Sequence, residues 1–311
     1  MRPVILDVNP GVDDAMAIIL AINSPEIEVM GVSVVSGNVP LSDCARNAMQ
    51  VLELLDRQDM PVYVGASKPL VREAVYAFEI HGEHGLGEAE LPEPEMMPVG
   101  DATSFLIESI NARPGEVTVV ATGPLTNLAI AEAREPGILQ QARRIIAMGG
   151  ALQEPGNITP MSEFNFHVDP HAARNVLLAG ANVTLLPLGV TEQVALDQAT
   201  LQQQVDAGAK YAPFCVEAAR SVIAASKRLY GRDNMFLHDP LAVALALAPD
   251  ICETEIHWLD VETDGQLAAG QVVVDRRPFV DDGERVGAEV ECAMRADIER
   301  VMGLFVERVL S

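Results

Sequence analysis

The stretch DVNPGVDDA, from Asp7 to Ala15, brings three carboxylates and one amide into eight residues: Asp7, Asn9, Asp13 and Asp14. Carboxylates packed this closely repel one another unless a proton or a cation lies among them. A hard divalent cation such as calcium or magnesium takes oxygen ligands of this kind. An ordinary alternative is a helix start capped by Asp13, with Asp14 in solvent. The stretch therefore predicts either a metal site or a helix cap.

The elements around this stretch form a corner between a strand and a helix. The apolar run from Pro3 to Leu6 predicts a buried strand, and residues 15–21 predict a helix. Pro10 and Gly11 break the strand between them. This order places Asp7 at the carboxyl end of the strand and the later two aspartates in the first helical turn, where the helix dipole favours anions.

Strand and helix patterns alternate along the chain after this corner. Further strands are expected at residues 27–35, 62–64, 117–121, 144–148 and 183–188, and helices at 41–55, 101–112, 169–178, 200–206, 211–229 and 241–248. This βαβ order predicts an α/β fold with an open, mainly parallel, doubly wound sheet. No linker composition or repeat interrupts it, so we expect a single domain over residues 1–311.

Polar residues follow several of the apolar strands. The residues expected at the carboxyl ends of parallel strands are Asp7, Asn38, Thr122, Met148 and Leu188. Ligands in open α/β sheets bind along this edge. The irregular segment 66–100 is long enough to be a lid or a binding loop. We therefore expect one crevice at the strand ends.

Composition excludes several kinds of partner. The formal net charge is −24, and a surface of this sign repels phosphate backbones, so no nucleic-acid polymer is expected. The four cysteines form no CxxC pair, which indicates reduced thiols in a cytoplasmic protein. The sequence shows no targeting segment and no apolar run of about 18 residues, so no membrane partner is expected.

A set of motifs follows in a specific order along nearly the whole chain: DVNPGVDDA at Asp7, SGN at Ser36, HGEHGLG at His81, ATGPLTN at Ala121, AMGG at Ala147, GN at Gly156, SEFN at Ser162 and HDP at His238. Together they closely resemble the nucleoside hydrolases, the inosine-uridine-preferring N-ribohydrolase family. The resemblance implies a fold related to the dinucleotide-binding (Rossmann) type and hydrolysis of the N-glycosidic bond of ribonucleosides to free base and ribose. It also implies a role in purine or pyrimidine salvage and assembly as a homodimer or homotetramer.

The resemblance further implies roles for individual residues. One calcium ion would be held by Asn9, Asp14, the carbonyl of Thr122 and Asp239. Ribose hydroxyls would be held by Asp13, Asn38, Asn157, Glu163 and Asn165, with Met148 packing nearby. His238 would assist the leaving base, and His81 lies in the loop that would cover the base.

The chemistry of the reaction supports this layout independently. Cleavage of an N-glycosidic bond passes through an oxocarbenium-like state, which requires a charged floor beneath the sugar, an activated water and a proton source for the base. Calcium lowers the pKa of a bound water, and Asn and Glu pair with hydroxyls.

The sequence departs from the family pattern at Asn9, where the family has an aspartate that binds calcium and takes the proton of the attacking water. An amide oxygen can ligate calcium, but an amide has no useful basicity at neutral pH. The change would be an engineered inactivation, a natural loss of activity, or a shift of the base role to Asp13 or Asp7. We favour a nucleoside hydrolase with impaired turnover, and a catalytically inactive nucleoside- or ribose-binding protein stands second.

A third hypothesis is an aspartyl-phosphate phosphatase with Asp7 as the nucleophile and magnesium beside it. It explains fewer features, because Pro10 and the runs SEFN and HDP have no place in that scheme.

Overall fold

The computed structural model describes residues 1–310. In chain order the strands are β1 (Arg2–Val8), β2 (Ile27–Val34), β3 (Val62–Val64), β4 (Gly100–Asp101), β5 (Thr118–Ala121), β6 (Arg144–Met148), β7 (Val183–Leu186), β8 (Ala195–Asp197), β9 (Asn234–Phe236), β10 (Cys252–Val261), β11 (Val272–Val274) and β12 (Ala288–Ala296).

The helices alternate with these strands. They are α1 (Val12–Ile22), α2 (Leu41–Leu54), α3 (Phe78–His81), α4 (Ala102–Ala112), α5 (Thr126–Arg134), α6 (Phe164–Val168), α7 (Pro170–Leu178), α8 (Leu188–Thr191), α9 (Gln198–Asp206), α10 (Ala212–Tyr230), α11 (His238–Leu247) and α12 (Ile298–Arg308), with short 3-10 turns at Leu139–Gln141 and Asp282–Glu284. Within the described chain no helix is long and apolar enough to cross a membrane.

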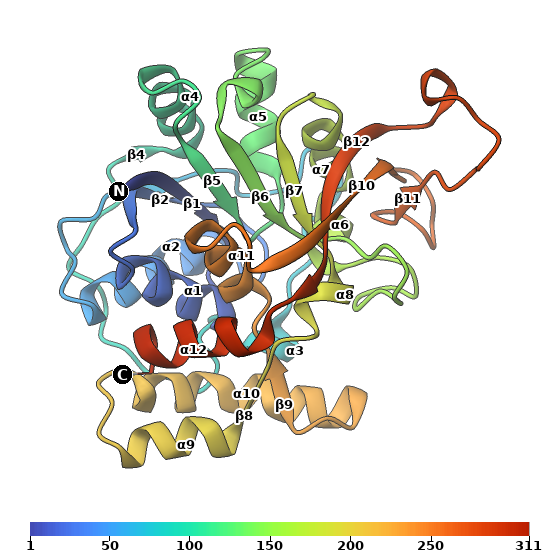
Figure 1. Cartoon of the computed structure of the whole chain (residues 1–311). Coiled ribbons are helices and arrows are strands. Elements are labelled where there is room, and N and C mark those ends of the chain that lie inside the picture. The colour runs from blue at the N-terminus through green and yellow to red at the C-terminus, as the bar shows by residue number, and fades with distance from the viewer. Residues whose placement is uncertain (311) are drawn as a thin grey trace.

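Ten strands form one sheet in the order β11-β10-β12-β7-β6-β5-β1-β2-β3-β4. The pairs from β12 through β4 are parallel, and only β10 pairs antiparallel with its two neighbours. The predicted open, mainly parallel sheet is therefore confirmed. Strands β10, β11 and β12 form its antiparallel edge, which extends away from the body of the molecule (Figure 1).

Two apolar layers cover the sheet, because successive side chains of a strand point to opposite faces. On β1, Val4 and Leu6 join the core beneath α1, α2 and α11, whereas Ile5 joins the core beneath α4, α5 and α7. Figure 1 shows these two groups of helices on opposite sides of the sheet. This doubly wound arrangement leaves the carboxyl ends of β1, β2, β5 and β6 together at one edge.

Local differences from the sequence expectation have physical reasons. Strand β7 ends at Leu186, and Leu188 begins helix α8 instead of ending the strand. Pro187 lies between them as the N-cap, and proline cannot continue a strand ladder. Strands β8 and β9 form a separate two-stranded sheet, which the sequence pattern did not predict. The segment 66–100 is irregular as expected, but it contains the short helix α3.

Candidate active site

The corner between β1 and α1 fixes Asp14 by hydrogen bonds from four groups. Its Oδ1 accepts from the Thr122 hydroxyl at 2.8 Å and from the Asn9 backbone N–H at 3.2 Å. Its Oδ2 accepts from the Gly11 N–H and the Asn38 side chain, each at 3.0 Å. The carboxylate therefore ties together the ends of β1, β2 and β5. The N-cap of α1 is Gly11, so the alternative in which Asp13 caps this helix is wrong.

Asp239 reaches the same place from the first turn of α11, which packs beside α1. Asp13, Asp14 and Asp239 each place one carboxylate oxygen within 4.8 Å of the others, and all three are buried. We call these three residues the carboxylate cluster. Helix N-termini stabilise anions, which explains why two first turns can converge here.

Burial makes this arrangement costly for charged carboxylates. Burial, together with the charge of Asp14, raises the pKa of Asp13 to about 7. Burial and the charges of the two neighbours raise the pKa of Asp239 well above its usual value. Burial also raises the pKa of Asp14, against hydrogen bonds from Gly11 and Thr122. Such a cluster accommodates either protons or a hard cation with oxygen ligands.

Asn9 lies at the edge of the carboxylate cluster, packed between the loop that contains Gly37 and the loop that contains Gly123. A Cβ atom at Gly37 would come within 2.2 Å of its amide, and one at Gly123 within 2.9 Å, so both positions need glycine for this close approach. The amide satisfies both ends when its nitrogen donates to Asp14 Oδ1 at 3.2 Å and its oxygen accepts from Asn38 N at 3.0 Å. An aspartate has the same shape and would fit the same space.

Asp7 does not join the carboxylate cluster. Its Oδ1 accepts from the Ser33 hydroxyl at 2.5 Å and from the Asn127 side chain at 2.8 Å. Burial raises its pKa to about 6, against these two hydrogen bonds. A carboxylate buried and bonded in this way is not placed to attack a phosphate. The phosphatase hypothesis, which needs Asp7 as its nucleophile, is therefore not supported.

Glu163 and Asn165 meet the cluster from the other side of β5. Glu163 accepts N–H bonds from Asn165 at 2.8 Å, Gly150 at 2.9 Å and Phe166 at 3.1 Å. The Asn165 side chain donates to the Thr122 carbonyl at 2.8 Å and lies 3.5 Å from the sulfur of Met148. These hydrogen bonds, with that of Asn38 to Asp14, fix the polar side chains around the Thr122 carbonyl.

Asn157 lies on an exposed turn beside Ser162, the neighbour of Glu163. Its backbone N–H donates to the Ser162 carbonyl at 3.2 Å. Within residues 1–310 no hydrogen bond joins its side chain to the other predicted ribose ligands. The structure therefore brings together all the predicted sugar and metal residues except Asn157.

Two histidines lie beside the cluster, and we call His81 and His238 the histidine pair. His81 is buried at the end of α3, where its Nδ1 accepts from the Val12 N–H at 3.1 Å. His238 opens α11, and its Nδ1 lies 2.7 Å from the Thr191 hydroxyl. Burial lowers the pKa of each to about 4, and the nearby His238 contributes to lowering that of His81. Both rings are therefore neutral near pH 7.

The loop that carries His81 is fastened by neighbouring helices. The buried Asn47 on α2 donates to the Pro10 carbonyl at 3.0 Å and to the His84 carbonyl at 2.7 Å, which joins the loop to the β1–α1 corner. On the other side, Ser221 of α10 donates to the Ile80 carbonyl at 3.2 Å. The loop is thus closed over the corner in this structure.

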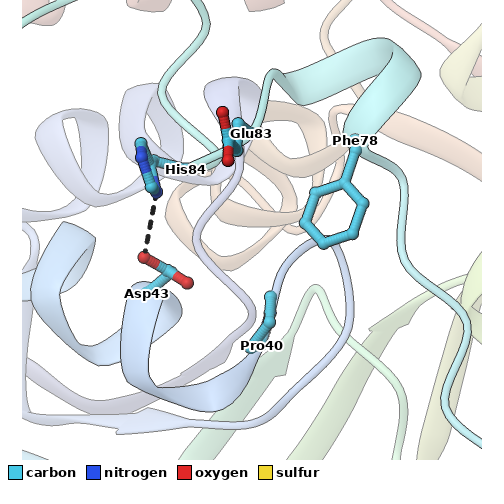
Figure 2. Close-up of a pocket in the computed structure, with 5 residues that line it drawn as sticks. All are labelled: Pro40, Asp43, Phe78, Glu83 and His84. Atoms are coloured by element: carbon cyan, nitrogen blue, oxygen red, sulfur yellow. Dashed lines mark ion pairs between the residues drawn. The ribbon is translucent and has the colours of Figure 1, made fainter.

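A pocket of about 500 Å³ lies outside this loop, lined by Pro40, Asp43, Phe78, Glu83 and His84. Figure 2 shows the Asp43–His84 ion pair, at 3.4 Å, on one side and Phe78 above Pro40 on the other. Its lining includes none of the predicted metal or ribose residues, so it is not the catalytic crevice.

Comparison with known proteins connects this geometry to a family. The sequence profile described as "Inosine-uridine preferring nucleoside hydrolase" matches residues 4–303. The chain belongs to this nucleoside hydrolase family. Pyrimidine-specific ribonucleoside hydrolase RihA of Salmonella typhi is 38% identical over 88% of each chain. An uncharacterized protein of Schizosaccharomyces pombe is 41% identical, again over 88% of each.

Solved structures of nucleoside hydrolases share the whole fold. A plant nucleoside hydrolase superposes with a TM-score of 0.93 at 32% identity, over 100% of this chain and 99% of the other. The purine-preferring ribonucleoside hydrolase from Gardnerella vaginalis gives 0.92 at 31% identity, over 99% and 98% of the two chains. The predicted family and fold are therefore confirmed.

Sequence reasoning missed three residues that position parts of this nucleoside hydrolase site: Asn47, Asn127 and Thr191. Each is fully or almost fully buried and bonds to a segment distant in the sequence. Asn127 belongs to the motif ATGPLTN, which was the available signal for it. Asn47 and Thr191 belong to no motif, so only the tertiary contacts reveal them.

Proposed function

We propose that this nucleoside hydrolase cleaves the N-glycosidic bond of ribonucleosides to give free base and ribose, with one bound calcium ion. The observation that carries the proposal is the buried carboxylate cluster at the carboxyl edge of the sheet, beside Glu163, Asn165 and the histidine pair. Charged groups so deeply buried are costly without a counterion. Relatives named as ribonucleoside hydrolases support the same reaction class.

The residues present fit a hard divalent cation. The available donors are carboxylate, amide and carbonyl oxygens, which suit calcium and magnesium rather than soft metals. In the proposal Asp14, Asp239, the Thr122 carbonyl and Asn9 hold calcium. When bound, it supplies positive charge and lowers the pKa of a water molecule. As a ligand, Asn9 would present its side-chain oxygen on the side of Asp14, whereas the amide orientation that satisfies hydrogen bonds to both Asp14 and Asn38 presents the nitrogen there.

The remaining polar residues hold the substrate. We assign the ribose hydroxyls to Asp13, Asn38, Asn157, Glu163 and Asn165, because carboxylate and amide groups offer the acceptors and donors that hydroxyls need. Met148 packs beside them. Asn157 would join them from its exposed turn, which is hydrogen-bonded to Ser162, the neighbour of Glu163. His81 covers the base, and His238 assists its departure.

Asn9 limits turnover in this proposal. In the family, the aspartate at this position is the general base. The amide of Asn9 cannot accept the proton of the attacking water. Asp13 is the remaining candidate base, since burial and Asp14 raise its pKa to about 7 and a base works best near the ambient pH.

The same observation favours a second candidate function, a nucleoside- or ribose-binding protein without turnover. Every hydrogen bond that shapes the ribose side is compatible with binding alone. The two functions differ only in whether the bond to the base is broken.

Product analysis separates the two functions. The full chain is incubated with uridine or inosine in calcium or in chelator, and free base and ribose are quantified over hours at stoichiometric enzyme. Slow, calcium-dependent release of both products supports hydrolysis. Tight nucleoside binding without release supports the binding protein, and neither binding nor release would overturn both.

A cytoplasmic location and a homodimeric or homotetrameric state complete the proposal. All four cysteines are free and buried, which fits a reducing compartment.

A further inference from the structure

The proposed function leaves the serine of the motif SEFN without a role. Ser162 is fully buried, and within residues 1–310 its hydroxyl forms a single hydrogen bond, to the carbonyl of Ala269 at 2.8 Å. A carbonyl oxygen can only accept, so Ser162 is the donor. The two residues are 107 positions apart, and Ala269 lies in the turn between β10 and β11. This bond therefore joins the middle of the chain to the antiparallel edge of the sheet.

The backbone of Ser162 holds the turn that carries Asn157. Its carbonyl accepts from the N–H groups of Asn157 at 3.2 Å and Ile158 at 3.3 Å, and its N–H donates to the Thr159 hydroxyl at 3.0 Å. In the described part of the chain, residues 155–161 form hydrogen bonds only with one another and with Ser162. The position of Asn157 therefore depends on that of Ser162.

On its other side, Ser162 precedes the short helix α6. The next residue, Glu163, is the N-cap of this helix, and Asn165 lies in its first turn. The helix has five residues, too few to be stable without contacts from outside. Because neighbouring residues share one backbone, a shift of Ser162 would move the Glu163 carboxylate and the Asn157 turn together.

The turn between β10 and β11 packs directly against α6. A Cβ atom at Gly270 would lie 2.6 Å from the Cα of His167 and 2.7 Å from the carbonyl oxygen of Phe166, so this approach needs glycine. The ring Nδ1 of His167 lies 3.1 Å from the Ala269 carbonyl. Within the turn, the Gly270 N–H donates to the Glu262 carbonyl at 2.8 Å. The turn therefore presents the Ala269 carbonyl to Ser162 from a fixed position.

We propose that Ser162 is a positioning residue for the ribose, anchored on the Ala269 carbonyl. The proposal rests on the proposed function, which assigns the ribose hydroxyls on this stretch to Asn157, Glu163 and Asn165. Ser162 is fully buried, so its hydroxyl acts through these neighbours and not on the sugar itself. The antiparallel edge of the sheet, which carries none of the predicted site residues, thereby takes part in substrate binding.

The first test is calorimetric binding to the full chain in calcium. Ser162→Ala should weaken the binding of uridine and inosine by roughly 5- to 30-fold, the effect of one lost buried hydrogen bond, and leave that of free uracil and hypoxanthine unchanged. Ser24→Ala is the matched control, because Ser24 is a buried serine that donates to the Leu20 carbonyl at 2.6 Å, beyond the far end of α1. It should leave the binding of nucleosides and of free bases unchanged.

A general loss of folding stability would give a different result. Equal weakening of nucleoside and free-base binding by Ser162→Ala, or an equal effect of Ser24→Ala on nucleoside binding, would overturn the proposal.

A double-mutant cycle shows whether Ser162 acts through Glu163. Ser162→Ala, Glu163→Gln and the double variant are compared for nucleoside binding. If the hydroxyl positions the carboxylate, the loss in the double variant should be smaller than the product of the two separate losses. Separate losses that multiply to within about twofold would mark independent sites and overturn the proposal.

Hydrogen exchange of the unmodified protein tests the same contact even if Ser162→Ala does not fold. Saturating nucleoside should slow amide exchange in residues 156–162 and in the turn 262–271 together, whereas free base should slow neither. Slower exchange in the first segment alone would overturn the role of the turn. A protein that binds no nucleoside would overturn the proposed function and this proposal with it. Nucleoside binding that Ser162→Ala leaves unchanged would overturn this proposal alone.

Discussion

The carboxylate cluster and the histidine pair lie side by side, yet they are held in different ways. Asp14 receives hydrogen bonds from three strand ends, and Asp239 projects from a helix packed into the core. His81 is on a loop fastened mainly by Asn47 and Ser221, and His238 depends on Thr191. The sheet itself therefore builds the carboxylate cluster, whereas the histidine pair depends on a few side-chain contacts.

Burial favours the uncharged form of both groups, although it shifts their pKa values in opposite directions. It raises carboxylate pKa values and lowers histidine pKa values, so both groups favour the neutral form. A bound cation would favour the charged form of the carboxylate cluster, while burial keeps the histidine pair uncharged near pH 7. This contrast predicts that calcium affects one side and loop contacts affect the other.

The largest expected effect comes from restoring the carboxylate at position 9. Asn9→Asp should raise ribose release from inosine and uridine by roughly 10² to 10⁴, the usual value of a positioned base, measured at saturating calcium. In chelator the same variant should be less stable, since a further carboxylate joins a group where Asn9 already lies 3.2 Å from Asp14. Asn9→Ala is the control and should show no gain. Equal turnover by all three proteins would place the base elsewhere, with Asp13 next to test.

The second prediction concerns stability against pH. Between about pH 4 and 7 the folded cluster binds more protons than the unfolded chain, because the pKa of Asp13 rises from 3.8 to about 7. Without calcium its contribution to stability therefore falls as pH rises through this window. The histidine pair contributes oppositely, gaining stability between about pH 4 and 6.5.

The free energy of unfolding is measured thermally in calcium and in chelator. The difference between the two values removes the contribution of the histidine pair. Calcium binds the deprotonated carboxylates, so its stabilisation should grow from pH 4 to 7 and reach roughly 2.7 kcal/mol at a hundredfold excess over Kd. Asp239→Asn should flatten this dependence. A calcium effect that is constant with pH would contradict the raised pKa values of the cluster.

The third prediction concerns the ribose side. Glu163→Gln and Asn165→Ala should each weaken nucleoside binding by about 1 to 3 kcal/mol, because the proposed function assigns each side chain a buried hydrogen bond to a sugar hydroxyl. Calorimetry with free uracil or hypoxanthine is the matched comparison and should show little change. Nucleoside binding that survives both substitutions would remove these residues from the sugar site.

The smallest expected effect lies on the base side. Asn47→Ala removes the bonds from α2 to Pro10 and His84, and it should raise KM about 3- to 10-fold through a looser loop, given about 1 kcal/mol per lost bond. Gln50→Ala is the control, since Gln50 fastens the same segment farther along, at Leu91 and Pro92. Equal changes in KM would show that the loop acts as one unit.

The sequence placed the residues around the carboxylate cluster better than those that hold the histidine pair, for a physical reason. Strand periodicity placed Asp7, Asn38 and Thr122 at one edge, and the motifs identified Asp14 and Asp239. The sequence did not predict that the Asp7 side chain bonds to Ser33. That contact depends on the register between β1 and β2, which places the two residues opposite each other. Likewise Asn47 and Thr191 act through contacts 37 and 47 residues away, which leave no local pattern.

The central claim is that the carboxylate cluster holds one calcium ion beneath the ribose, and calorimetric titration of the chelator-treated protein with calcium tests it most directly. We predict one ion per chain, loss of binding in Asp14→Asn and Asp239→Asn, and retained binding in Asp7→Asn, whose carboxylate is buried outside the cluster. Far-ultraviolet circular dichroism confirms that each variant is folded. A folded protein that binds no calcium, or binds it equally well in Asp239→Asn, would contradict the account.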